Sequence, residues 1–199
     1  EKVAIVNSGK SPITEPGLDQ LVESAVRKRL LSATKDASGQ LDSCTLAIVC
    51  VGTPSAPDGS HNMSFVAEVS HQIADLIGPT RTTTLTVVFR STMRPGTIED
   101  LVLPIFESTL NGRIDLIEVV YNPEFLRESV AIEDFFNPPK IVIGTRDGER
   151  CTVLDELNAN IAVPVFYTTY RTAEMTKFVD NSFHAVKIAF ANEVGRVCD

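Results

Sequence analysis

The sequence predicts an α/β protein, an incomplete Rossmann-like doubly wound parallel sheet followed by one long amphipathic helix. Apolar runs typical of strands that are covered on both faces occur at 46–51, 85–89 and 116–120. Segments with helical spacing separate these runs, and strands that alternate with helices favour a parallel sheet. The last segment, 172–199, carries an apolar stripe at helical spacing, which predicts one long helix.

The remaining elements are expected between and around these runs. A helix begins near Pro16, a favourable first helical residue, and carries apolar side chains along one side. Further helices are predicted at 65–77, 98–106 and 148–160, and further short strands at 141–143 and 163–166.

Composition and charge exclude several classes of protein. The chain has 199 residues, of which 43% are hydrophobic and 22% charged, as in ordinary soluble globular proteins. Its net charge of −8 argues against nucleic acid or an anionic membrane as a partner. No apolar run is long enough to cross a bilayer, and residues 1–30 lack a signal-peptide pattern. The four cysteines lack metal-site spacing, so we expect reduced thiols, no metal and a cytoplasmic location.

Polar residues follow three of the predicted strands at the point where each strand ends. The segments are GTPS at 52–55, RST at 90–92 and NPE at 122–124. In a doubly wound sheet, ligands bind outside the carboxyl ends of the strands. We therefore expect these three segments to converge on one functional edge of the sheet.

Two acids follow the strand at 116–120. Glu124 lies just beyond the strand, and Glu128 is predicted one helical turn further on, on the same face. Two carboxylates held together can have their pKa values pushed apart, which suits acid/base chemistry. The alternative is an ordinary first helical turn enriched in acids that interact with the helix dipole.

The long helix predicted at 172–199 has two distinct sides. Its polar side holds Lys177, Asn181, His184 and Asn192, which is either a functional stripe or a solvated face. Asparagine and histidine are poor helix formers, and a solvated face would more often use Glu, Lys or Arg. The apolar side comprises Met175, Val179, Phe183, Val186, Phe190, Val194 and Val197.

Five ordered segments give the chain a resemblance to a known family. They are SPITEPGL (11–18), VGTPSAPDG (51–59), RSTMRPGT (90–97), NPEFLRES (122–129) and AEMTKFVDNSFHAVKIAFANE (173–193). From about residue 3 to the end, the sequence resembles the nucleotide-sugar 6-dehydrogenases, which comprise UDP-glucose and GDP-mannose dehydrogenases. Ser129 and His184 favour the GDP-mannose branch.

The resemblance implies an enzyme that uses NAD to oxidise the sugar C6 alcohol of GDP-mannose or UDP-glucose to the uronate, through a cysteine-bound thioester. Glu124 then corresponds to the carboxylate that activates the hydrolytic water, with Thr92 in the same water network and Glu128 in an assisting position. Lys177 and Asn181 correspond to the groups that stabilise the oxyanion. The implied cofactor contacts are Thr53, Pro54 and Thr92, and the implied substrate contacts are Phe125, Leu126, Arg127, His184 and Asn192.

The chain departs from the family in two large ways. It lacks the glycine-rich GxGxxG turn that receives the cofactor pyrophosphate, and it ends before the nucleophilic cysteine, which Cys198 does not replace. We therefore expect a fragment truncated at both ends: 1–168 as a partial NAD-binding domain and 169–199 as the start of a central helical domain. We expect this chain to be inactive by itself. The alternatives are a non-catalytic oligomeric or binding module derived from the enzyme, and a different hydroxyacid dehydrogenase, which would not explain NPEFLRES.

The missing first strands have a structural consequence. In the Rossmann strand order, 46–51 becomes an apolar edge when they are missing. The long helix is also expected to lose its packing against the substrate domain, which exposes its apolar side. We expect a homodimer or higher homo-oligomer that buries this side, with the edge covered by pairing or by a rearranged N-terminus. Residues 3–6, helical by analogy with the family, read equally well as a replacement strand.

Overall fold

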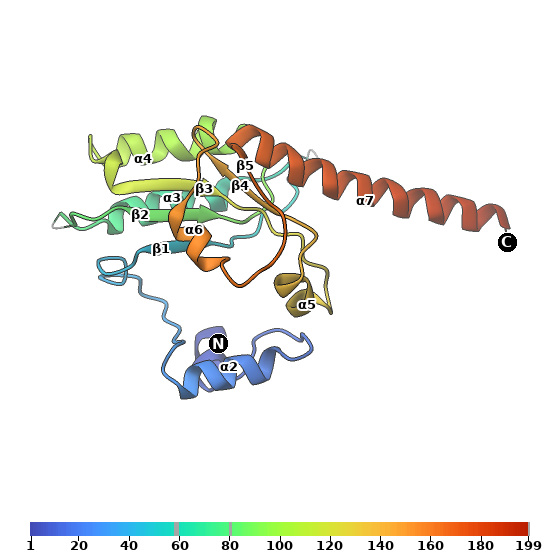
Figure 1. Cartoon of the computed structure of the whole chain (residues 1–199), viewed down its shortest axis with the longest axis horizontal. Helices are drawn as coiled ribbons and strands as arrows, with labels where there is room; N and C mark the ends of the chain where they lie inside the picture. The colour runs from blue at the N-terminus through green and yellow to red at the C-terminus, as the bar shows by residue number, and fades with distance from the viewer. Residues whose placement is uncertain (58–59, 80, 199) are drawn as a thin grey trace.

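The computed structural model describes residues 1–57, 60–79 and 81–198. Its five strands form one sheet whose spatial order follows the sequence (Figure 1). They are β1 (Leu46–Val49), β2 (Leu85–Phe89), β3 (Ile117–Tyr121), β4 (Ile141–Thr145) and β5 (Val165–Thr169). β1, β2 and β3 are parallel, β4 runs antiparallel to β3, and β5 is parallel to β4. The α/β class is confirmed, and the one antiparallel junction is a feature that the sequence pattern did not predict.

Both faces of the sheet are covered, which explains why its central strands are continuous apolar runs. Every residue of β2 is buried. Val87 and Phe89 belong to one core cluster, whereas Val88, between them, belongs to a second cluster on the opposite face. The first cluster packs under α3 (Ser64–Leu76) and α4 (Leu103–Thr109), and the second under α6 (Thr152–Leu157).

The helix predicted at 98–106 is interrupted. Its first part is a π-helical segment, η1 (Ile98–Val102), and α4 follows with Pro104 in its first turn. Pro104 has no amide hydrogen to bond the carbonyl four residues earlier, so the preceding turn is widened. The sequence pattern also missed a 3₁₀ turn, η2 (Ile114–Leu116), and the short helix α5 (Ala131–Phe136).

The N-terminal segment lies against the loop after β3 and not beside β1. It holds α1 (Lys2–Asn7) and α2 (Leu18–Arg27), which lie below the sheet in Figure 1. Between these helices, the Glu15 carboxylate accepts hydrogen bonds from the amides of Ser129 (3.1 Å) and Ala131 (2.8 Å). Residues 3–6 lie in α1, so of the two possibilities left open by the sequence the helix implied by the family resemblance is present and the replacement strand is not.

β1 is an edge strand among the residues that the structure describes. It pairs with β2 alone, and Ile48 is 46% exposed. The edge that the missing family strands were expected to leave is therefore present, and no segment within the described ranges covers it.

The long helix α7 (Tyr170–Cys198) is anchored at one end only. Its buried residues all lie in its first eight positions, and every residue from Val179 to Cys198 is exposed. The rest of α7 extends away from the sheet (Figure 1), so its apolar stripe is uncovered within one chain. None of the helices in the described part of the chain has the length and hydropathy of a membrane span.

The base of α7 lies directly on β4 because Gly144 has no side chain. A Cβ atom at Gly144 would be 2.7 Å from the Cβ of Ala173 and 3.3 Å from the Cα of Tyr170. Gly144→Ala is therefore expected to lower the free energy of unfolding by about 1–3 kcal/mol through overpacking. Urea denaturation followed by circular dichroism measures this change.

The matched control is Gly195→Ala, because nothing lies within 4 Å of a Cβ at that exposed helical position. This variant should be neutral or more stable, since alanine is the better helix former. Equal stability of the two variants would contradict the close-packing argument.

Candidate functional site

The site is built around Lys177, whose side chain is almost entirely buried although it carries an ammonium group. The residue is 4% exposed, on the third turn of α7. Its Nζ donates to the main-chain carbonyl of Glu124 and lies 3.1 Å from Glu124 Oε1. It also lies 5.2 Å from the centre of the Phe125 ring. A buried ammonium needs such partners, so the contact joins α7 to the end of β3.

Glu124 begins a tight turn and not a helix. Its Oε2 accepts a hydrogen bond from the amide of Leu126 at 2.7 Å. Residues 122–130 are irregular, and α5 begins only at Ala131. The prediction that Glu128 lies one helical turn from Glu124 is therefore wrong, and so is the alternative that the acids form a first helical turn. The physical reason is that the amides of Arg127 and Ser129 bond to the side chains of Asp134 and Glu15, and Ser129 has a φ of +69°, which a helix does not allow.

The ends of the three parallel strands are bound together, as their polar sequences predicted. Arg90 Nη1 donates to Asn122 Oδ1 at 2.5 Å, and the Asn122 amide donates to the Phe89 carbonyl at 2.9 Å. Ser91 Oγ donates to the Val51 carbonyl at 2.6 Å. Burial lowers the pKa of Arg90, although Cys50 and Glu124 oppose this shift. The expected convergence on one edge is confirmed.

An open cavity of about 840 Å³ lies between the loop after β3 and α7. It brings together seven of the residues singled out from the sequence. These are Phe125, Leu126, Arg127, Glu128, Lys177, Asn181 and His184. Asn192 lies further along α7 and does not line it. Thr53, Pro54 and Thr92 are also outside its lining, on the segments that follow β1 and β2.

Arg127 pairs with an acid within the same loop. Its Nη2 lies 2.8 Å from Asp134 Oδ1, while its Nε and main-chain amide donate to Asp134 Oδ2 at 3.0 and 2.9 Å. Hydrogen bonds from Arg127 lower the pKa of the Asp134 carboxyl. Of the two possibilities left open by the sequence, contact with substrate or pairing with an acid, the pairing is present.

Lys140 is a member of this region that the sequence pattern missed. Its Nζ lies 4.4 Å from the centre of the Phe125 ring and 3.0 Å from Asp180 Oδ1. Phe125 is thus contacted by two ammonium groups, those of Lys140 and Lys177. The only sequence signal was a lysine directly before a strand, which is too common to single out.

The residues present fit only part of an NAD site. Thr53 and Pro54 follow β1, and Thr92 follows β2, at the strand ends where such a cofactor binds. The pyrophosphate requires a strand, a glycine-rich turn and a helix N-terminus. The described ranges contain no such unit beside the free edge of β1. They also contain no group of three residues that could hold a metal ion.

The fold and this edge define a Rossmann-like α/β domain joined to a long helix, and the comparisons with known proteins identify the family. Residues 1–162 match the NAD-binding domain of the UDP-glucose/GDP-mannose dehydrogenase family, and residues 171–199 match its central domain. The chain belongs to this family, whose cofactor is NAD. The resemblance inferred from the five sequence segments is confirmed.

Individual relatives support the same assignment. The chain is 37% identical over 197 residues to GDP-mannose 6-dehydrogenase of Pseudomonas aeruginosa, and 38% identical over 205 residues to UDP-glucose 6-dehydrogenase of Rhizobium meliloti. These alignments cover 98% and 100% of this chain but 45% of each relative. The chain therefore spans less than half the length of the curated relatives it matches.

Solved structures of the same family have the same fold as this chain. A ternary complex of GDP-mannose dehydrogenase from Pseudomonas aeruginosa matches 98% of this chain, with a TM-score of 0.91 and 38% identity, and 44% of that structure is covered. A UDP-glucose dehydrogenase from Pyrobaculum islandicum matches 97% of the chain and is itself 44% covered, with a TM-score of 0.88 and 36% identity.

The Arg127–Asp134 pair yields a prediction about titration. Because Arg127 depresses the Asp134 pKa, Arg127→Gln should move that pKa up toward its ordinary value of 3.8. A carboxyl whose folded pKa is depressed stabilises the protein above its unfolded pKa, and this contribution is lost as pH falls through the folded pKa. NMR titration of the Asp134 carboxyl carbon measures the shift.

Arg27→Gln is the control, since Arg27 pairs with Glu23 on the exposed face of α2. It should leave the Asp134 titration unchanged. An Asp134 pKa that is the same in Arg127→Gln and in the unsubstituted protein would contradict the assigned cause.

Proposed function

We propose that this chain is part of an NAD-dependent nucleotide-sugar 6-dehydrogenase. In this proposal residues 1–168 form part of the NAD-binding domain, and residues 169–199 begin the central helical domain. The match of the family models on either side of residue 170 supports this division. So does the structure of α7, which packs on the sheet at its base and leaves the rest exposed.

The contact between Lys177 and Glu124 is the observation that carries the proposal. An ammonium group beside a carboxylate, at the carboxyl end of a strand and next to a cavity, combines an oxyanion-stabilising group with a general base. We assign Lys177 and Asn181 to stabilisation of negative charge on the sugar C6 oxygen. Glu124 accepts a proton from the hydrolytic water, with Thr92 and Glu128 as neighbouring polar groups.

The cofactor and the substrate have separate places in this proposal. When bound, NAD accepts hydride from the sugar, and Thr53, Pro54 and Thr92 line its side of the site. The cavity beside α7 receives the sugar nucleotide, with Phe125, Leu126, Arg127 and His184 as contacts. We propose GDP-mannose over UDP-glucose, on the strength of His184, which lines the cavity, and of Ser129 in the neighbouring loop. Asn192 lies further along α7 and does not line this cavity.

Activity of this chain by itself is not expected. The described residues contain no pyrophosphate cradle, and Cys198 lies on the exposed end of α7, far along the helix from Lys177. We expect that the purified chain forms no NADH when it is mixed with NAD and GDP-mannose or UDP-glucose. The absorbance of NADH is the measurement. Steady production of NADH by the pure protein would contradict this expectation.

Weak binding of the sugar nucleotide is the corresponding positive prediction. Calorimetry should show tighter binding of GDP-mannose than of UDP-glucose. Lys177→Ala should weaken the binding of GDP-mannose about tenfold, because it removes a charge-assisted contact. Lys35→Ala, in an exposed loop, is the control and should bind like the unsubstituted chain. Equal binding by Lys177→Ala and Lys35→Ala would remove Lys177 from the proposed site.

We also propose that the chain self-associates through the apolar stripe of α7. Val179, Phe183, Val186, Phe190 and Val197 are each more than half exposed, and such a surface is unfavourable in water. Light scattering at micromolar concentration should show a dimer or larger species, and Phe190→Glu should shift it toward monomer. Asn192→Glu, on the polar side of the helix, should not. A clean monomer of the unsubstituted chain would contradict this proposal.

A further inference from the structure

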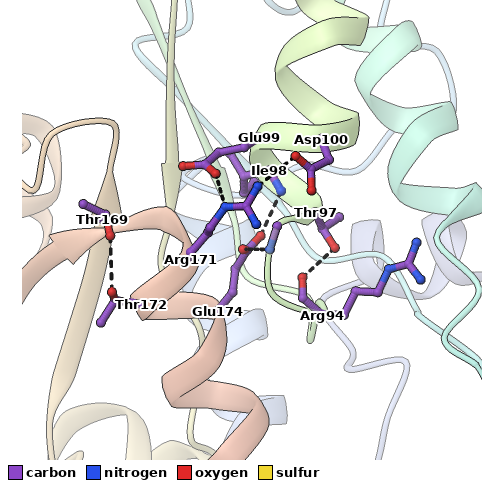
Figure 2. Close-up of polar contacts among 10 residues, drawn as sticks. Arg94, Thr97, Ile98, Glu99, Asp100, Thr169, Arg171, Thr172 and Glu174 are labelled. Carbon is purple, nitrogen blue, oxygen red and sulfur yellow. Dashed lines mark hydrogen bonds and ion pairs between the residues drawn. The ribbon is translucent and has the colours of Figure 1, made fainter.

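Glu174 is a fully buried acid one helical turn before Lys177 on α7. Its carboxylate oxygens each accept one main-chain hydrogen bond from the segment that follows β2 (Figure 2). Oε2 accepts from the Gly96 amide at 2.5 Å, and Oε1 accepts from the Ile98 amide at 2.8 Å. These amides lie at the start of η1, so one side chain of α7 holds the beginning of the helix beside it.

Burial of this carboxylate carries a cost that packing alone would not require. Desolvation raises the pKa of Glu174, and the two amide hydrogen bonds, from Ile98 and Gly96, oppose that rise. An apolar side chain would fill the same space without the desolvation of a charge. The two bonds to one short segment therefore indicate a role in position, because they fix where α7 lies relative to the loop after β2.

Arg171 joins the same two elements nearer the surface. It pairs with Glu99, and its Nη2 lies 2.9 Å from Asp100 Oδ1 (Figure 2). Gly96 makes the close approach possible, since a Cβ there would lie 2.6 Å from Asp100 Oδ2 and its φ is +94°. The base of α7 is thus held to η1 at two depths, by a buried carboxylate and by a half-exposed guanidinium.

We propose that Glu174 is a positioning residue for Lys177. By holding the amides of Gly96 and Ile98, it sets the depth and rotation of α7, and so places the Lys177 ammonium against Glu124. It also couples that ammonium to the loop of residues 90–97, which carries Thr92. The catalytic meaning of this coupling rests on the proposed function, whereas the positioning itself does not.

The geometry makes Lys177 sensitive to a small movement of α7. Residues three apart on a helix lie on one face, so a shift at Glu174 is transmitted to Lys177. A charge-assisted hydrogen bond requires a separation near 3 Å, and the Lys177–Glu124 contact is at 3.1 Å. The competing explanation is that packing of Ala173 on Gly144 positions the helix by itself, in which case Glu174 contributes stability alone.

The test compares Glu174→Gln with Arg171→Gln, a control in the same cluster. The glutamine amide can accept from one of the two main-chain amides but not from both. Competitive labelling of amines, read by mass spectrometry, measures the reactivity of Lys177 relative to the exposed Lys35 in the same molecule. Lys177 should become about tenfold more reactive in folded Glu174→Gln, because local opening that exposes it costs less free energy, and should change less than about twofold in Arg171→Gln.

Unchanged Lys177 reactivity in folded Glu174→Gln would overturn the proposal. If that variant fails to fold, the unsubstituted chain decides the matter through native-state hydrogen exchange in dilute urea. Exchange of the Gly96 and Ile98 amides, and labelling of the Lys177 amine over the same urea series, should then give the same opening free energy. Exposure of Lys177 while both amides stay protected would overturn it equally. Neither measurement needs turnover or a sugar nucleotide, so failure here is distinct from failure of the proposed function.

Discussion

The arrangement of the molecule depends on how closely the first turns of α7 approach β4. Gly144 presents only a hydrogen atom to Ala173, and the Tyr170 hydroxyl donates to the Val119 carbonyl at 2.7 Å. These contacts place the start of the helix across two strands of the sheet, near the antiparallel junction of β3 and β4. Because packed interiors deform little, this approach holds the base of α7 on the sheet, while the Glu174 hydrogen bonds to Gly96 and Ile98 set its rotation toward the end of β3.

The electrostatics of the site follow from that placement. The Lys177 side chain is almost entirely buried, and its partners are the carboxylate and carbonyl of Glu124 and the face of Phe125. Lys140, directly before β4, lies over the same Phe125 ring, and its ammonium group pairs with the Asp180 carboxylate. Two ammonium groups can lie near one another here because each has its own carboxylate. Each of the two ammonium groups at this site is therefore balanced by a carboxylate, within a chain that is acidic as a whole.

Prediction from sequence succeeded for segments that have a regular hydrophobic period and are packed against another layer of the fold. β2 was predicted at its observed limits, and the buried apolar run left no alternative. It failed for the loop after β3, where the Arg127 amide bonds to Asp134 and the Ser129 amide to Glu15, so no helix forms before α5. The direction of β4 and the role of Lys140 depend on contacts between distant segments, which no local pattern encodes. Lys177, Asn181 and His184 were predicted to share one side of the helix and all three line the cavity, because helical periodicity holds over several turns.

The exposed part of α7 has a thermodynamic consequence. Beyond Asp180, whose carboxylate pairs with Lys140, the helix makes no hydrogen bond or ion pair to another element among the described residues, and about five turns of helix in water are only marginally stable. Its ordering is therefore governed by local hydrogen bonding and side-chain entropy, and fraying should increase steadily toward Cys198. Binding of a surface that covers the stripe must offset the free-energy cost of ordering the helix and the entropy lost on association. The measured affinity is therefore weaker than the contact energy alone would give.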